Sequence, residues 1–491
     1  MAEIWSYMMD KGNKVISNFI WRFAERSGAQ AVKLLVELIL ARLLLPDDYG
    51  TIALVAVFIT ILNVFVDSGM GNALIQKKDA DDLDFSSVFY FNLLWCTVLY
   101  TLLFVSAPVI GEFYKRQELI PIVRVLGITI LISGLKNVQQ AYVSRNMLFR
   151  KFFFATLGGT IGAALTGIVM AYRGFGVWAL VTQQLLNAAV DTLILWITVK
   201  WRPKRLFSIE RLMRLFSYGW KLLASGLLDT VYTNIRALII GKIYSSSDLA
   251  YYNQGDKLPN VIVGNINSSI DSVLLPTMSQ EQDDAERVKV MTRRAIKTST
   301  YIMAPLMIGL AVAADNLIRI ILTEKWIPCV VFLRIFCITY MFQPIHTANL
   351  NAIKALGRSD LFLKLEMCKK VVGMTLLLST MWISVEALAY SSLIGCVLAQ
   401  IINSWPNRRL LYYGYIDQLK DIMPSIGLAL LMGLCIYPLS LIPIHQILIV
   451  TLQVIFGALT YIGVSYAIKL DAFMYLLAML KKFKKKRKER I

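Results

Sequence analysis

The chain has 491 residues, of which 57% are hydrophobic and 17% are charged, and its formal net charge is +19. Soluble globular chains contain about 45–50% apolar residues, and a water-soluble protein of this length could not hide the excess. The basic residues punctuate apolar runs, whereas a nucleic-acid-binding module gathers them on a polar surface. The composition therefore excludes a soluble enzyme, a disordered chain and a nucleic-acid binder, and it is typical of a polytopic membrane protein.

Residues for metal binding or soluble catalysis are scarce. The chain has two histidines, His346 and His445, and its six cysteines lie in or beside apolar runs without a CxxC pair. It has no P-loop, HExxH or GxSxG motif. We expect no enzyme activity, no metal and no cofactor, with coupling to protons or sodium ions left open.

Long apolar runs dominate the chain from its N-terminus onward. A membrane-spanning helix needs about 20 mostly apolar residues, and helices are the default because an open sheet would leave backbone groups unpaired in lipid. By this criterion the sequence predicts an all-α protein with about fourteen transmembrane helices. They lie near residues 15–44, 50–73, 85–110, 119–142, 152–172, 176–199, 214–243, 258–278, 297–322, 328–353, 361–383, 386–404, 421–440 and 446–468.

Lysine and arginine are concentrated in alternate loops. If the N-terminus is inside, the basic segments 76–82, 144–151, 200–214 and 285–297 are inside as well, together with the C-terminal tail. Because short cytoplasmic loops carry an excess of Lys and Arg, the pattern predicts a multi-pass protein of a bacterial cytoplasmic membrane with both termini in the cytoplasm.

Similar sequences open helices about 200 residues apart. Trp21 and Trp220 begin related segments, and the helices that follow end near acidic turns at Asp48 and Asp248. Six helices per repeat is an even number, so both copies keep the same orientation, as in parallel-repeat transporters. This predicts two pseudo-symmetric six-helix lobes, plus two extra helices at the C-terminal end.

The predicted domains follow from this repeat. The linker between the lobes alternates apolar and charged residues and is expected to be an amphipathic helix on the cytoplasmic surface, or else a solvated connector. The C-terminal tail has an apolar first half and a basic end, which favours binding to anionic lipids. The domains are an N-lobe over 1–200 (helices 1–6), a linker over 201–213, a C-lobe over 214–410 (helices 7–12), helices 13 and 14 over 411–470, and a basic tail over 471–491.

The first predicted helix carries charge at membrane depth. Arg22, Glu25, Arg26, Lys33 and Glu37 fall within an arc of roughly 120° on a helix, and a charge at the centre of a membrane helix costs about 2.5–3.5 kcal/mol. This stripe must face a partner helix or a water-filled cavity. One alternative is pairing along the helix itself, although that leaves Arg26 without a local partner.

Two sets of charged residues are therefore candidates for a site. Several cations with few unpaired acids suit an anionic substrate, and Arg matches phosphate oxygens in particular. The candidates for binding substrate in a central cavity are Arg22, Arg26, Lys33, Lys136, Arg236 and Lys364. An acid at membrane depth can bind a proton or sodium ion, or it can simply neutralise a nearby cation. The candidates for ion coupling are Glu25, Glu37, Asp67, Asp229 and Asp271.

Several segments resemble the polysaccharide-transporter branch of the multidrug/oligosaccharidyl-lipid/polysaccharide exporter superfamily, and most closely its Wzx-type lipopolysaccharide and teichuronic-acid flippases. The segments are LARLLLPDDYG (40–50), Asp67-Ser-Gly69, GFGVWALV (174–181), ALIIGKIYSSSDLAYYNQGDKLP (237–259) and VLLPTMSQEQDD (273–284). The family often has Gly where Ala250 stands here.

The resemblance implies two six-helix lobes forming a V around a central cavity, and alternating access. The cargo would be an oligosaccharide on undecaprenyl pyrophosphate, and polysaccharide polymerase machinery would be a possible partner. A multidrug or other lipid exporter of the same superfamily is an alternative. A membrane polymerase or glycosyltransferase would need a long outside loop. The Asp47-Asp48 pair lies in a short one and is interpreted as a helix-end turn.

Overall fold

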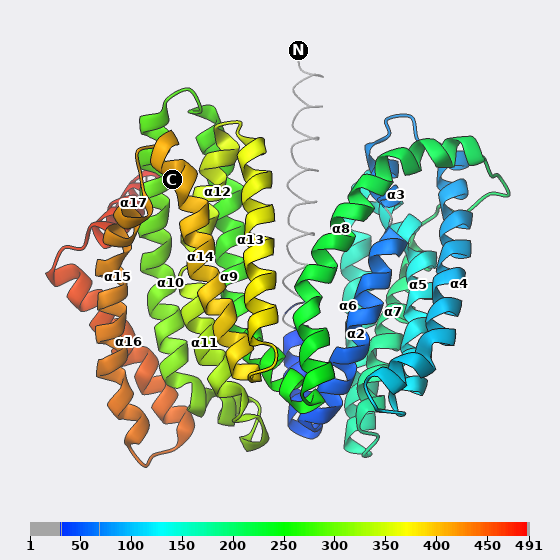
Figure 1. Ribbon diagram of the computed structural model, residues 1–491, viewed down its shortest axis with the longest axis horizontal. Helices are drawn as coiled ribbons and strands as arrows, with labels where there is room; N and C mark the ends of the chain where they lie inside the picture. The colour runs from blue at the N-terminus through cyan, green and yellow to red at the C-terminus, as the bar shows by residue number, and fades with distance from the viewer. Residues whose placement is uncertain (1–29, 31, 68, 489–491) are drawn as a thin grey trace. The chain divides into compact units, whose positions relative to one another are not determined.

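The computed structural model describes residues 30, 32–67 and 69–488, and the chain divides into two compact units. The first unit ends at Ala250 and the second begins at Tyr251. Throughout the described residues the regular structure is helical, with no β-strand, which confirms the predicted all-α class. Figure 1 labels the helices in chain order.

The first unit contains a helical segment over residues 32–43 followed by seven labelled helices. Within it α6 packs on α7, α4 on α5, and α2 on both α5 and α8. The helices are α2 (Pro46–Asp67), α3 (Met70–Gln76), α4 (Asp82–Phe113), α5 (Leu119–Arg145), α6 (Phe149–Tyr172), α7 (Val177–Thr198) and α8 (Ile209–Ile243).

The second unit is organised around one central helix, α10. This helix contacts α11, α12, α15, α16 and α17, while α13 packs mainly on α14. The helices are α9 (Ser246–Gln280), which begins at the end of the first unit, α10 (Ala285–Ile321), α11 (Cys329–Met341), α12 (Gln343–Ala355), α13 (Ser359–Thr380), α14 (Val385–Leu410), α15 (Tyr415–Ile436), α16 (Gln446–Ala467) and α17 (Asp471–Lys488), with short 3₁₀ turns η1 (Glu324–Trp326) and η2 (Tyr437–Leu441).

Among the described residues, ten helical segments are long and apolar enough to cross a membrane, so the chain is a multi-pass membrane protein. Three further predicted spans, α8, α9 and α13, are long helices that are too polar to meet this criterion. The first predicted helix, 15–44, lies largely outside the described residues. The count of fourteen therefore stays a prediction.

The helices that precede α6 and α13 end in the same type of turn. Before α6, Met147 has φ 53° and Leu148 N–H donates to the Val143 carbonyl at 2.9 Å. Before α13, Gly357 has φ 71° and Arg358 N–H donates to the Ile353 carbonyl at 3.1 Å. A left-handed residue followed by this 6→1 hydrogen bond is a Schellman motif. The same helix end thus recurs 210 residues later.

The predicted linker helix begins later than expected. Residues 199–208 are not helical, and α8 starts at Ile209. Pro203 disfavours helical conformation in the residue before it, and the segment is instead held against the start of α4. Lys204 N–H donates to Ser86 Oγ at 3.0 Å, and the Trp201 side chain is buried in the core beside α4. The helix therefore occupies only the last part of 201–213.

Candidate functional site

A backbone break interrupts the predicted span 50–73 and divides it into α2 and α3. Gly69 has φ 69°, the left-handed region that favours glycine. A Cβ on Gly69 would lie 2.5 Å from the carbonyl oxygen of Gly219 on α8, so the two backbones approach closely here. The break places Asp67, a candidate for ion coupling, at the end of α2.

Asp67 and Lys136 lie near each other but have different partners. Asn137 Nδ2 donates to Asp67 Oδ1 at 3.1 Å, which joins the end of α2 to α5. Lys136 Nζ lies 2.5 Å from Asp191 Oδ2 on α7, and this carboxylate is largely buried. The structure thus brings Lys136 to an acid from the same unit, which compensates its charge.

The other described site candidates of the first unit lie on two helical segments. Lys33 is exposed and Glu37 half-buried on the helical segment 32–43, while Asp229 is exposed and Arg236 half-buried on α8. Three candidates from the predicted stripe, Arg22, Glu25 and Arg26, lie outside the described residues.

In the second unit two candidates lie on polar helices. Asp271 on α9 accepts a hydrogen bond from Asn351 Nδ2 of α12 at 2.5 Å. Lys364 is exposed on α13. The roles of both sets of candidates remain predictions, because nothing in the structure shows what these groups bind.

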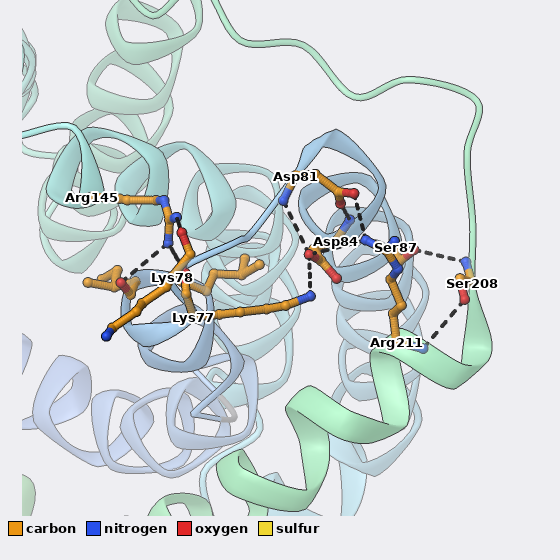
Figure 2. Close-up of polar contacts among 10 residues, drawn as sticks. Lys77, Lys78, Asp81, Asp84, Ser87, Arg145, Ser208 and Arg211 are labelled. Atoms are coloured by element: carbon orange, nitrogen blue, oxygen red, sulfur yellow. Dashed lines mark hydrogen bonds and ion pairs between the residues drawn. The ribbon is translucent and has the colours of Figure 1, made fainter.

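An ion-pair network connects the segment after α3 with the start of α8 (Figure 2). Lys77 Nζ lies 2.6 Å from Asp84, and Arg211 lies 2.6 Å from Asp81. Asp81 also accepts the Asp84 backbone N–H at 3.0 Å, and Asp84 accepts the Asp81 N–H in return, which forms a capping box for α4. The Asp84 N–H and the Arg211 guanidinium hold the pKa of the Asp81 carboxyl at about 2.

Arg145 at the end of α5 reinforces this network from the other side (Figure 2). Its guanidinium donates to the carbonyl oxygens of Leu74 and Lys78 at 2.8 and 2.7 Å, and also to that of Lys77. The carbonyls at the end of a helix lack partners within the helix. Arg145 therefore satisfies the end of α3 and fixes the basic segment that follows it.

The opposite end of the first unit carries the Asp47-Asp48 pair. Asp48 Oδ2 accepts the Leu45 N–H at 2.9 Å, which confirms the predicted helix-end turn. Asp47 pairs with Arg116 at 2.6 Å and accepts the Ser246 hydroxyl. Both acids therefore have structural partners.

A buried polar network in the second unit was not predicted. Asn403 Nδ2 lies 2.9 Å from His346 Nδ1, and His346 Nε2 lies 3.4 Å from Cys396 Sγ. Nearby, Asn349 and Gln418 exchange two side-chain hydrogen bonds of 2.8 and 3.0 Å. Asn and Gln residues within apolar runs of the sequence were the feature from which this network could have been predicted. Among the described residues no group of three or more His, Cys, Asp or Glu could hold a metal ion.

A protein family model matches much of the chain. The family model described as "Polysaccharide biosynthesis protein" matches residues 39–331, which is more than half of the chain. The matched region runs from the helical segment 32–43 to the start of α11, and so includes the α2–α3 break and the polar helices α8 and α9.

Curated relatives carry related names. The teichuronic acid biosynthesis protein TuaB of Bacillus subtilis is 26% identical over 61% of this chain and 62% of its own length. The succinoglycan biosynthesis transport protein ExoT of Rhizobium meliloti is 24% identical over 64% of this chain and 63% of its own length. The chain thus spans less than two thirds of these two relatives. The lipopolysaccharide biosynthesis protein WzxC of Escherichia coli is 22% identical over 74% of each chain.

Solved structures share the fold. The lipid II flippase MurJ in an inward closed conformation matches with a TM-score of 0.74 and 15% identity, over 92% of this chain and 99% of its own. An inward-facing multidrug resistance transporter of the MATE family matches with a TM-score of 0.58 and 16% identity, over 81% and 95%. At these identities the likeness shows that the chain has the fold of both neighbours.

Proposed function

This chain belongs to the polysaccharide biosynthesis protein family, and from that premise we propose that it is a flippase for lipid-linked oligosaccharides. It carries oligosaccharide units on undecaprenyl pyrophosphate from the inner to the outer leaflet of the cytoplasmic membrane, by alternating access. It acts as a transporter and not as an enzyme.

The names of the curated relatives carry this proposal. They are biosynthesis or transport proteins of three different surface polysaccharides. The polymers differ while the sequences of the relatives remain similar. The relatives therefore share a step that is common to the synthesis of all three polymers. Transfer of a lipid-linked precursor across the membrane is such a step, whereas each glycosyl transfer is specific to one sugar.

The polar helices support a polar path through the membrane. In α8, α9 and α13 the length suffices to cross a bilayer but the composition does not suit contact with lipid. Polar groups at membrane depth face protein or water. We assign the pyrophosphate of the cargo to Arg236 and Lys364 on these helices and to Lys33 of the segment 32–43, because phosphate oxygens require compensating charge in a low dielectric.

Coupling, orientation and partners are further parts of the proposal. Among the ion-coupling candidates that the structure describes, Asp229 and Asp271 lie on the polar helices, and we assign the binding of a coupling proton or sodium ion to them. Both termini lie in the cytoplasm, and the basic end of α17 binds anionic lipids. A polysaccharide polymerase acts on the product in the outer leaflet.

Reconstitution in liposomes tests the function. An undecaprenyl-pyrophosphate oligosaccharide is placed in both leaflets, and its accessibility to an added periodate reagent is followed over time. We expect the inner-leaflet pool to become accessible only in vesicles that contain the protein. Accessibility equal to that of protein-free vesicles, or growth of the glycan without movement, contradicts the proposal.

Two substitutions test the cationic assignment. Lys33→Ala and Lys364→Ala should each slow movement by about tenfold or more, the effect of losing one charge-assisted hydrogen bond. Lys420→Ala on α15 is the matched control, because Lys420 is also exposed and is not among the cations assigned to the cargo. Equal rates in all three variants would show that these cations do not contact the cargo.

A further inference from the structure

A polar pocket lies inside the first unit, beside the α2–α3 break. Its volume is about 380 Å³, which falls in the range of small-molecule sites. The lining comes from the end of α2 and from α3, α5 and α6. The polar side chains in this lining are Asp67, Asn72, Asn137, Gln140, Ser144 and Thr156.

Small residues and the backbone break keep the pocket open. Gly69 lets the chain turn between α2 and α3, so that Asp67 and Asn72 both line the same space. Gly71 is also part of the lining, and a Cβ there would lie 3.0 Å from Asn137 Oδ1. A larger residue at either position would displace the polar side chains or fill the space between them.

Several polar groups in the pocket have no protein partner. Within the described part of the chain, the side chains of Asn72, Gln140 and Thr156 make no hydrogen bond to another protein group, unlike those of their neighbours. By contrast, the Thr160 hydroxyl, one turn along α6, donates to the Thr156 carbonyl at 2.7 Å. These side chains line the pocket and are not buried, so they are free to exchange hydrogen bonds with a ligand or with water there.

The chemistry of the lining favours an uncharged polyhydroxyl ligand. Amides and hydroxyls both donate and accept hydrogen bonds, and the Asp67 carboxylate accepts them. An anion such as phosphate would be repelled by Asp67. A bare cation would leave most of the space empty, since the pocket exceeds the volume of one water, about 30 Å³, by roughly tenfold. Phe152 adds an apolar surface of the kind that covers the C–H face of a sugar ring.

The pocket also lies at the end of the unit where the cargo would arrive. Ser144 begins the predicted inside loop 144–151 and Phe152 follows it, while Ile75 precedes the predicted inside loop 76–82. If the proposed function is correct, the oligosaccharide is presented on this side of the membrane. We propose that this pocket is a saccharide subsite, which holds one or two sugar residues of the cargo while cations elsewhere bind its pyrophosphate.

Two substitutions that keep side-chain size test the subsite. Gln140→Leu and Thr156→Val are combined in one variant, because each removes hydrogen-bonding groups with little change in volume. Thr160→Val is the matched control on the same helix, since its hydroxyl bonds only to backbone. Liposome transport is measured for undecaprenyl pyrophosphate bearing an oligosaccharide and for the same lipid without sugar, and binding of both lipids is measured in detergent.

We expect the Gln140→Leu/Thr156→Val variant to bind and move the oligosaccharide-bearing lipid about tenfold less well, the effect of losing a few hydrogen bonds. Its binding of the sugar-free lipid and its thermal stability should match those of the wild type. Unchanged discrimination between the two lipids overturns the subsite while leaving the flippase intact. An equal loss for both lipids also overturns it, since that indicates a structural role.

Two further results distinguish a failure of the subsite from a failure of the proposed function. If the wild type moves neither lipid, the proposed function fails and the subsite fails with it. Asp67→Asn tests a cation site in the same pocket, because it removes the charge but keeps an accepting oxygen. If Asp67→Asn abolishes a sodium or pH dependence of transport while the Gln140→Leu/Thr156→Val variant keeps the wild-type discrimination between the two lipids, the pocket is an ion site and the inference is wrong.

Discussion

Asp48 and Asp248 lie 200 residues apart and make the same hydrogen bond. Each carboxylate accepts the backbone N–H three residues earlier, that of Leu45 at 2.9 Å and that of Ser245 at 3.1 Å. In the second case the Ser245 hydroxyl also accepts the Asp248 N–H at 3.0 Å, which completes a capping box. The turns at the start of α2 and at the start of α9 are therefore alike, and in each the acidic residue has a structural role.

Removing either acid should destabilise its helix. Asp48→Ala and Asp248→Ala each lose one capping interaction, at a cost of about 1 kcal/mol, and we expect a drop in Tm of about 2–4 °C for the detergent-solubilised protein. Asp283→Ala is the control, because Asp283 is exposed in the turn before α10. A Tm equal to that of the control in both variants would mean that these turns do not depend on their acids.

Gly69 should tolerate no side chain. Gly69→Ala forces an L-residue into φ 69° and places a Cβ against the Gly219 carbonyl, so we expect a loss of at least about 1–3 kcal/mol. Gly162→Ala on α6 is the control. A Cβ at Gly162 meets nothing within 4 Å, and alanine is the better helix former by about 1 kcal/mol. In thermal unfolding, the Tm of Gly69→Ala should fall below that of the wild type, and the Tm of Gly162→Ala should rise above it.

Hydropathy predicted the helices well where one helix is uniformly apolar. The predicted spans 152–172 and 176–199 correspond to α6 (Phe149–Tyr172) and α7 (Val177–Thr198). It did not predict the breaks within apolar runs. The span 328–353 divides at Phe342, before Pro344, and 50–73 divides at Gly69. Proline and glycine give local signals there, but an average over 20 residues conceals them.

The polar contacts between helices could not be predicted in the same way. Asn349 meets Gln418 across 69 residues of sequence, and Lys136 meets Asp191 across 55. The charge of Lys136 is visible in the sequence, which is why it was a candidate. The partner of Lys136 depends on how α5 packs on α7, and this packing cannot be predicted from a single sequence. The pocket beside Gly69 was missed for the same reason, because its residues come from four helices.

The Lys136–Asp191 ion pair should show strong coupling. Breaking a buried pair leaves one uncompensated charge and costs about 3–5 kcal/mol, whereas replacing both partners by apolar residues is often nearly neutral. We expect Lys136→Met and Asp191→Leu to lower the yield of folded protein and its Tm separately, and the double variant to recover most of both. A double variant that equals the sum of the single losses would show that the pair is not formed.

Low pH should loosen the network around α4 and α8. The pKa of Asp81 is about 2 in the folded protein, against a usual value of 3.8. A group with a lowered pKa stabilises the fold fully above its unfolded value, and this contribution disappears as pH falls from about 4 towards 2. Because the Asp81 side chain is half exposed, we expect no more than about 1 kcal/mol from it. Thermal unfolding of wild type and Asp81→Asn at pH 6 and at pH 3 measures this. The difference in Tm between the two proteins should be present at pH 6 and smaller at pH 3, and a difference that does not change with pH would show that the Asp81 charge contributes nothing.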